Sequence, residues 1–184
     1  MLSVKSLRAP FSQIQWEKRR ICTLFDGVKL ATNIKTEVKQ NIIDFQYRHK
    51  QDGKEHFKPK LIAIAVGNIP ASEIYLKKKE EAAKFCGLDF NKVSLKENIS
   101  EIYLRDLIKS LNRDKTVSGI IVQLPLPSHM SEINVCNTVS PTKDVDGFTQ
   151  TNLGKLMQNV GENSLIPCTA LAVKRIVASL KIKY

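Results

Sequence analysis

The sequence has no long apolar run and no clustered cysteines. Its longest uninterrupted apolar stretch, Leu61–Val66, is six residues long, far shorter than the ~20 residues that a membrane-spanning helix needs. The four cysteines lie at least 32 residues apart, and the three histidines do not cluster with them. This spacing argues against a sequence-local zinc site and a disulfide scaffold. We therefore expect buried or idle thiols in a reducing compartment.

Glycine is sparse as well. The eight glycines are scattered singly, and no Gly-rich turn opens a helix, which excludes a phosphate-binding loop of the common dinucleotide type within these 184 residues. The remaining composition is ordinary. With 42% hydrophobic and 26% charged residues, the chain matches a soluble globular protein rather than a disordered, collagenous or coiled-coil one. Its length predicts one domain with a sizeable core.

Positive charge is in excess and unevenly distributed. The chain has 29 basic and 18 acidic residues, a net charge of +11, which favours anionic partners such as nucleic acid, a membrane surface or small carboxylated molecules. Residues 1–20 contain five basic residues and one acidic residue, with serines between them. This composition predicts a mitochondrial targeting leader and a location in the mitochondrial matrix. The alternative is a basic tail without a targeting role.

The spacing of apolar residues predicts alternating helices and strands. Residues 26–45 have helical periodicity, residues 46–60 are polar and predict a loop, and the apolar run 61–66 predicts a buried strand. A helix is expected over residues 71–86, ended by Gly87.

The second half of the chain continues the alternation. A helical stripe covers residues 104–111, a strand over residues 119–124 precedes two prolines, Ser131 caps a short helix, and a last helix starts near Thr169. The order of elements predicts an α/β fold, a three-layer domain with a largely parallel sheet flanked by helices.

Two polar side chains in the helix over residues 71–86 suggest chemistry. Tyr75 and Lys79 are four residues apart and share one face of the helix. A phenol beside an amine is a usable acid/base pair. The competing interpretation makes Lys77, Lys78 and Lys79 a solvated charge run, with Tyr75 partly in the core.

Other candidates follow the second strand. Gln123 lies at its carboxyl end, where open α/β sheets bind ligands, although a structural glutamine with satisfied hydrogen bonds fits equally well. Asp144 and Asp146 lie in a turn that ends at Gly147 and project alike if the segment is extended. One of them could accept hydrogen bonds from an amino-pyrimidinone edge. A calcium loop needs more oxygen ligands, so no metal is expected.

Four segments in order carry a family resemblance: Val66–Lys79, Gly119–Pro127, Lys143–Gly147 and Ile166–Thr169. Together they resemble the catalytic domain of the methylenetetrahydrofolate dehydrogenase/cyclohydrolase family. The resemblance covers roughly residues 21–180, and we expect residues 21–184 to form that domain. With the basic leader, the sequence is similar in kind to the mitochondrial bifunctional enzymes.

The resemblance implies a role for each matching residue. Lys79 resembles the catalytic lysine, and Gln123 the glutamine that hydrogen-bonds it. Tyr75 resembles the tyrosine that stacks on the folate and orients it, and Asp146 the carboxylate that holds the pteridine edge. Ser72 is implied as a further substrate-binding residue.

The implied cofactor is NAD or NADP, with Cys168 and Thr169 facing it. The family usually continues this segment with Pro-x-Gly, where the present sequence has Ala170 and Ala172. Proline pre-sets a helical start and glycine permits close backbone approach, so both properties are lost here. The family's nucleotide-binding domain, which holds most of the cofactor site, is expected beyond the matched region and is missing from these 184 residues.

The implied function is a multifunctional oxidoreductase and hydrolase of one-carbon tetrahydrofolate metabolism. A hydride passes from a methylene that bridges two folate nitrogens to the nicotinamide, and water then hydrolyses the methenyl cation. The implied partners are the folate and a second copy in a homodimer, with neither nucleic acid nor membrane. The alternatives are a folate-binding or dimerising module without turnover and a basic nucleic-acid binder, which is supported by charge alone.

Overall fold

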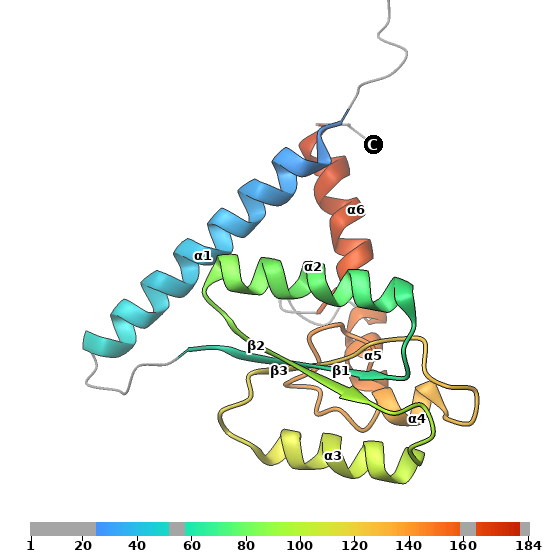
Figure 1. The fold of residues 1–184 in the computed structure, drawn as a ribbon. Coiled ribbons are helices and arrows are strands. Elements are labelled where there is room, and N and C mark those ends of the chain that lie inside the picture. Colours follow the sequence, from blue (N-terminus) through green and yellow to red (C-terminus); the bar gives the residue numbers. More distant parts are fainter. Residues whose placement is uncertain (1–24, 52–57, 159–164, 181–184) are drawn as a thin grey trace, which may run out of the picture.

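The computed structural model describes residues 25–51, 58–158 and 165–180; the expected leader over residues 1–20 lies outside them. Figure 1 shows a sheet with α1 and α2 on one side and α3 on the other. The elements in chain order are α1 (Gly27–Gln51), β1 (Lys60–Val66), α2 (Pro70–Cys86), β2 (Asp89–Leu95), α3 (Glu101–Arg113), β3 (Gly119–Val122), α4 (Glu132–Cys136), α5 (Gln150–Met157) and α6 (Cys168–Ser179).

The three strands form a parallel sheet in the order β2-β1-β3. The central strand β1 pairs along its whole length with β2, and its residues 61–64 pair with β3. Parallel strands need a crossover on a face of the sheet, and here α2 and α3 provide these crossovers on opposite faces. The predicted α/β fold with a parallel sheet between helices is confirmed.

The two faces of β1 differ in the size of their side chains. Ile62, Ile64 and Val66 point into the larger core, which includes Leu104 and Ile108 of α3. Ala63 and Ala65 point to the other face and pack with Leu76 of α2 and Ile121 of β3. Because alanine is small, α2 can approach the sheet closely on this face. This close packing fixes the helix that bears Tyr75 and Lys79.

The expected helix over residues 71–86 is confirmed, and its ends follow from the sequence. Pro70 occupies the first turn, where its missing N–H costs nothing. Gly87 has a left-handed conformation with φ of 85°, and the N–H of Leu88 donates to the carbonyl of Ala83 at 2.9 Å. A glycine in this conformation ends a helix without steric cost.

Four boundaries or elements differ from the sequence-based prediction. Helix α1 continues to Gln51, so the predicted loop is wrong for residues 46–51, which contain neither glycine nor proline. Strand β3 ends at Val122, two residues before its predicted end. Strand β2 and helix α5 were not predicted. The sequence of β2 is polar because none of its residues is buried, in contrast to β3, the strand at the other edge.

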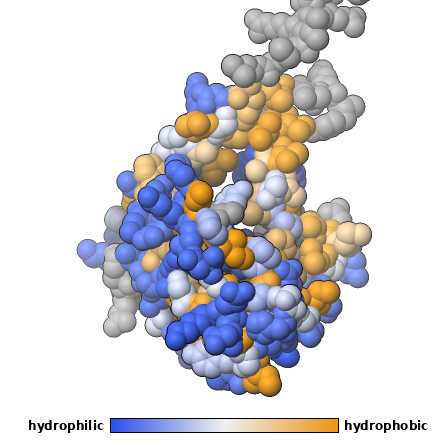
Figure 2. Space-filling view, turned by 45° about the vertical axis from the view of Figure 1, so that its right-hand side comes forward, coloured by the Kyte–Doolittle hydropathy of each residue, from blue (hydrophilic) through white to orange (hydrophobic). Residues whose placement is uncertain are grey.

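The short helix after Ser131 is confirmed as α4. The Ser131 hydroxyl accepts a hydrogen bond from the backbone N–H of Asn134 at 3.3 Å, the N-cap contact that the sequence predicted. The last helix also forms, starting at Cys168. Figure 2 shows hydrophobic side chains gathered on the surface over α6, and none of its residues is buried.

Candidate functional site

Lys79 and Gln123 come from distant parts of the chain and meet beside the sheet. The Lys79 ammonium donates to the Gln123 side-chain carbonyl at 3.3 Å. The Gln123 amide group donates to the carbonyl of Leu124 at 2.9 Å, and its backbone N–H donates to Ile64 at 2.8 Å. These bonds hold the glutamine and direct its side-chain oxygen toward the lysine. Gln123 is therefore satisfied within the fold and also orients Lys79.

The other two candidates on α2 have contrasting surroundings. Tyr75 lies one turn before Lys79, and 65% of its surface is exposed, so the interpretation that places it partly in the core is wrong. Lys77 and Lys78 are exposed, whereas Lys79 is half-buried, which separates Lys79 from a uniformly solvated run. Ser72 is buried and lines a small pocket with Gln123 and Pro125.

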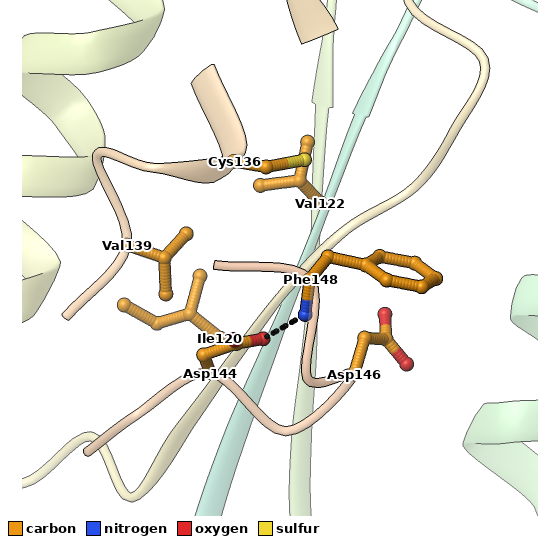
Figure 3. A pocket seen from close by; sticks show the side chains of 7 residues that line it. All are labelled: Ile120, Val122, Cys136, Val139, Asp144, Asp146 and Phe148. Atoms are coloured by element: carbon orange, nitrogen blue, oxygen red, sulfur yellow. Dashed lines mark hydrogen bonds between the residues drawn. The ribbon is translucent and has the colours of Figure 1, made fainter. Parts of the chain in front are cut away.

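Asp146 lies at a second small pocket, lined by Ile120, Val122, Cys136, Val139, Asp144 and Phe148. In Figure 3 its carboxylate lies beside the Phe148 ring. Burial raises the pKa of the Asp146 carboxyl; the Lys79 ammonium acts against this rise and the Asp144 charge adds to it. The positive charge of Lys79 therefore favours the ionised form of Asp146. Among the described residues, no hydrogen bond to the Asp146 carboxylate contributes to its pKa.

Asp144 has a different environment from Asp146, because the segment turns rather than extends. Its side chain is 4% exposed and accepts the backbone N–H groups of Gly147 and Thr149 at 2.8 and 2.9 Å. Burial alone would raise the pKa of Asp144, but donors from Thr149, Asn152 and Phe148 outweigh it and lower the pKa. The two carboxylates of this turn therefore do not project alike.

The pocket also contains a thiol that sequence analysis left unassigned. Burial, together with the negative charges of Glu132, Asp144 and Asp146, raises the pKa of Cys136 to about 11. A thiol with so high a pKa stays protonated at neutral pH and is a poor nucleophile. Cys136 and Phe148 therefore shape the pocket around Asp146, and no motif in the sequence identifies them.

Cys168 and Thr169 begin α6, where both are exposed. No hydrogen bond among the described residues joins them to Lys79 or Gln123. The glycines with positive φ in the described ranges, Gly67, Gly87 and Gly147, stand singly and form no Gly-rich turn. The described residues therefore do not fit the phosphates of a nicotinamide nucleotide, and we assign no reaction step to that group.

Two further features are absent from the described part of the chain. Its His, Cys, Asp and Glu residues include no group of three that could hold a metal ion. Within the same ranges, no helix combines the length and apolar character required to cross a membrane.

The chain matches a known domain and known structures. The model for the tetrahydrofolate dehydrogenase/cyclohydrolase catalytic domain matches residues 25–146. The bifunctional protein FolD of Hydrogenobaculum sp. is 40% identical over 154 residues, which are 84% of this chain and 52% of that relative. The chain thus spans about half the length of the curated relatives it matches.

Two solved structures extend the comparison to the fold. The bifunctional enzyme FolD, a methylenetetrahydrofolate dehydrogenase/cyclohydrolase from Campylobacter jejuni, is 38% identical with a TM-score of 0.77, covering 87% of this chain and 54% of that one. The dehydrogenase-cyclohydrolase of Trypanosoma brucei, solved with NADP and an inhibitor, is 28% identical with a TM-score of 0.81, covering 88% and 52%. The chain therefore belongs to the tetrahydrofolate dehydrogenase/cyclohydrolase family, and its residues 25–146 correspond to the catalytic domain.

Proposed function

We propose that this chain binds a tetrahydrofolate derivative against α2, Gln123 and Asp146 and provides the acid/base chemistry of a methylenetetrahydrofolate dehydrogenase/cyclohydrolase in one-carbon metabolism. One observation carries the proposal. Lys79 is half-buried, bonded to Gln123 at 3.3 Å, and coupled electrostatically to Asp146 from a third segment of the chain. Three distant segments thus contribute a base, an orienting amide and a carboxylate that accepts no hydrogen bond from the described residues.

The carboxylate and the aromatic ring suit a folate. An ionised carboxylate accepts two adjacent N–H donors, which an amino-pyrimidinone edge offers. Burial makes this interaction stronger than it would be in water. The exposed ring of Tyr75 offers a face for stacking on a flat aromatic ligand. Ser72, beside Gln123 in the adjoining pocket, adds a hydroxyl that can donate or accept.

Lys79 is the group that we assign to proton transfer. In methenyl hydrolysis, water adds to the bridging carbon, a base takes its proton, and one carbon–nitrogen bond breaks as that nitrogen is protonated. A lysine in its amine form can take the first proton and return it to the leaving nitrogen. Gln123 keeps the lysine side chain directed to one place, which preserves its geometry during the reaction.

Three substitutions test these roles. Lys79→Met should lower the rate of methenyltetrahydrofolate hydrolysis by roughly 10²–10⁴-fold, the usual contribution of general acid/base catalysis, with little change in folate affinity. Asp146→Asn replaces one acceptor oxygen with a donor that faces the ligand's own donors, and it should weaken binding by about 1–3 kcal/mol. Tyr75→Phe keeps the stacking ring and should have an intermediate effect.

Lys78→Met is the matched control, because Lys78 is exposed and pairs with Glu81 at 3.3 Å. Affinity is measured by titration calorimetry with tetrahydrofolate, and hydrolysis by the loss of methenyl absorbance. If the hydrolysis rate were unchanged in Lys79→Met, or fell equally in Lys78→Met and Lys79→Met, the interpretation of Lys79 as part of a solvated charge run would be favoured instead.

The second candidate is a folate-binding or dimerising module without dehydrogenase turnover. It is favoured by the exposure of Cys168 and Thr169 and by the lack of a phosphate cradle among the described residues. The Trypanosoma brucei relative was solved with NADP and the Saccharomyces cerevisiae relative is NAD-dependent, so NAD or NADP is the cofactor that we propose for the first candidate, the dehydrogenase. The purified 184-residue chain should bind folate but should not reduce NAD or NADP at a useful rate. Robust NAD- or NADP-dependent oxidation would refute this candidate.

We also propose that residues 1–20 direct the protein to the mitochondrial matrix, that residues 21–184 form the catalytic domain, and that two copies associate as a homodimer. The excess of basic residues in the first segment supports the first of these proposals. A reporter fused to residues 1–20 should enter mitochondria, whereas a version with the five basic residues changed to glutamine should not. A uniformly cytosolic native fusion would contradict the assignment.

A further inference from the structure

Asp144 holds the turn that presents Asp146. Its carboxylate accepts three consecutive backbone N–H groups, from Gly147 at 2.8 Å, Phe148 at 3.3 Å and Thr149 at 2.9 Å. The Phe148 contact is drawn in Figure 3. Three donors to one buried carboxylate fix the path of the backbone immediately after Asp146, because each bond restricts one peptide unit.

Asn152 of α5 braces the same carboxylate. Its amide group donates to Asp144 at 2.9 Å and to the carbonyl of Pro141 at 3.0 Å. Thr149 caps α5 by accepting the Asn152 backbone N–H at 3.3 Å. Asp144, Thr149 and Asn152 are all at most 4% exposed. Water therefore cannot replace any of these contacts without opening the loop.

The chain before Asp146 is fixed from the other side. The N–H of Ile120 in β3 donates to the carbonyl of Lys143 at 2.8 Å. The Lys143 ammonium donates to the carbonyls of Leu111 and Asp114 at the end of α3, at 2.9 and 2.6 Å. Both ends of the turn are thus held, while no hydrogen bond from the described ranges anchors the Asp146 carboxylate.

We propose that Asp144, braced by Asn152, is a positioning residue: it lines the small pocket beside Asp146, but the turn and Asn152 already occupy its two oxygens, so it holds Asp146 in place and does not itself bind the ligand. The proposal rests on the proposed function for the part that Asp146 plays. It assigns different tasks to the two carboxylates of one turn, and it makes ligand affinity depend on a residue that folate does not contact. The relevant geometry is the position of the Asp146 side chain, because a displacement of about 1 Å in a binding group is enough to lower activity by ~10²-fold.

The test begins with Asp144→Asn in the full 184-residue chain. The amide replaces one acceptor oxygen with a donor that faces backbone N–H groups, so the turn should loosen. Tetrahydrofolate affinity, measured by calorimetry, should fall by at least about tenfold. Asp26→Asn is the control, because Asp26 also accepts a backbone N–H, from Lys29 at 2.9 Å, but does so at the start of α1.

The double variant separates positioning from general structural damage. If Asp144 acts through Asp146, Asp144→Asn combined with Asp146→Asn should bind as Asp146→Asn does, within about twofold. The proposal would be overturned if the affinity losses of the two single variants multiplied in the double variant. It would also be overturned if Asp144→Asn bound tetrahydrofolate with native affinity. A native protein that binds no tetrahydrofolate would instead refute the proposed function, and this is seen before any variant is compared.

A second variant and a measurement without ligand cover the remaining cases. Asn152→Ala keeps the three backbone donors to Asp144 and removes its brace, so the domain should fold even if Asp144→Asn does not. Amide hydrogen exchange at Gly147 and Thr149 should become faster in Asn152→Ala, while amides of β1 stay protected. Unchanged exchange at both amides would overturn the proposal whatever the ligand result.

Discussion

Gly119 is the position where adding one methyl group should disturb the candidate site without touching any of its polar groups. A Cβ at Gly119, the first residue of β3, would lie 2.6 Å from Cγ1 of Val145 and 3.0 Å from Cδ1 of Leu61. Nonbonded carbon atoms are at their best separation at about 3.5–4.0 Å. Gly119→Ala therefore forces Val145 to move by roughly 1 Å or to change rotamer.

The expected cost follows from where Val145 lies. It is the residue before Asp146, and Asp144 and Lys143 hold the chain on its other side. Overpacking of this kind usually destabilises a domain by about 1–3 kcal/mol. Displacement of Asp146 by a comparable distance should also lower tetrahydrofolate affinity by up to ~10²-fold. Both losses should appear together in Gly119→Ala.

Two variants make the assay decisive, with unfolding followed in urea and affinity followed by calorimetry. Gly154→Ala introduces the same methyl group within α5, where nothing lies within 4 Å, and should stabilise the protein by about 0.5–1 kcal/mol. Val145→Ala removes the clashing methyl, so the double variant Gly119→Ala with Val145→Ala should recover much of the lost affinity. Native stability and affinity in Gly119→Ala alone would refute the packing argument.

Three other predictions concern charge, a thiol and the exposed surface. Burial raises the pKa of Asp146 above its unfolded value, so the ionised carboxylate lowers folding stability at pH 7, whereas the protonated carboxyl below pH 4 does not. Asp146→Asn should therefore raise the melting temperature at pH 7, and this difference should disappear in acid. Because the pKa of Cys136 is about 11 and Cys168 is exposed, iodoacetamide at pH 7.5 should modify Cys168 well before Cys136; equal rates would contradict this. The surface over α6 is apolar, and Val173 is 57% exposed there, so the chain should self-associate at high concentration, as measured by light scattering. Val173→Glu should reduce this association, and a stable native monomer would refute the prediction.

The sequence predicted those elements whose apolar residues recur at a regular spacing or form a continuous run. The apolar run 61–66 identified β1 because the strand is covered by helices on both faces. Helix α2 was predicted from the Asn-Ile-Pro segment that precedes it and from Gly87, at which it ends. Strand β2 escaped prediction because it is a partly exposed edge strand. Its polar residues make tertiary contacts instead, as when Lys92 pairs with Glu73 of α2 at 2.7 Å.

The candidate site was only partly predictable for a related reason. Lys79, Gln123 and Asp146 were singled out by residue type, by position relative to a strand end, and by the family resemblance. The arrangement around Asp146 depends on contacts between segments that no local pattern encodes. Asn152 lies in α5, a helix of eight residues that was not predicted, and its bond to Asp144 exists only in the folded chain.

The turn with Asp144 and Asp146 illustrates how one fold separates stability from chemistry. Both residues are aspartates two positions apart, yet their pKa values shift in opposite directions from the usual value. The pKa of Asp144 is lowered because folding supplies hydrogen-bond donors that favour its charge. Its ionised form therefore stabilises the native state at pH values above the pKa of the unfolded chain, and this stabilisation is lost as the pH falls through the lowered pKa of the folded state. Asp146 is partly desolvated, and none of the residues placed by the structure donates a hydrogen bond to it, so its charge destabilises the ligand-free protein at neutral pH. A ligand with two N–H groups would supply the missing donors, which makes the unfavourable environment of Asp146 a source of binding energy.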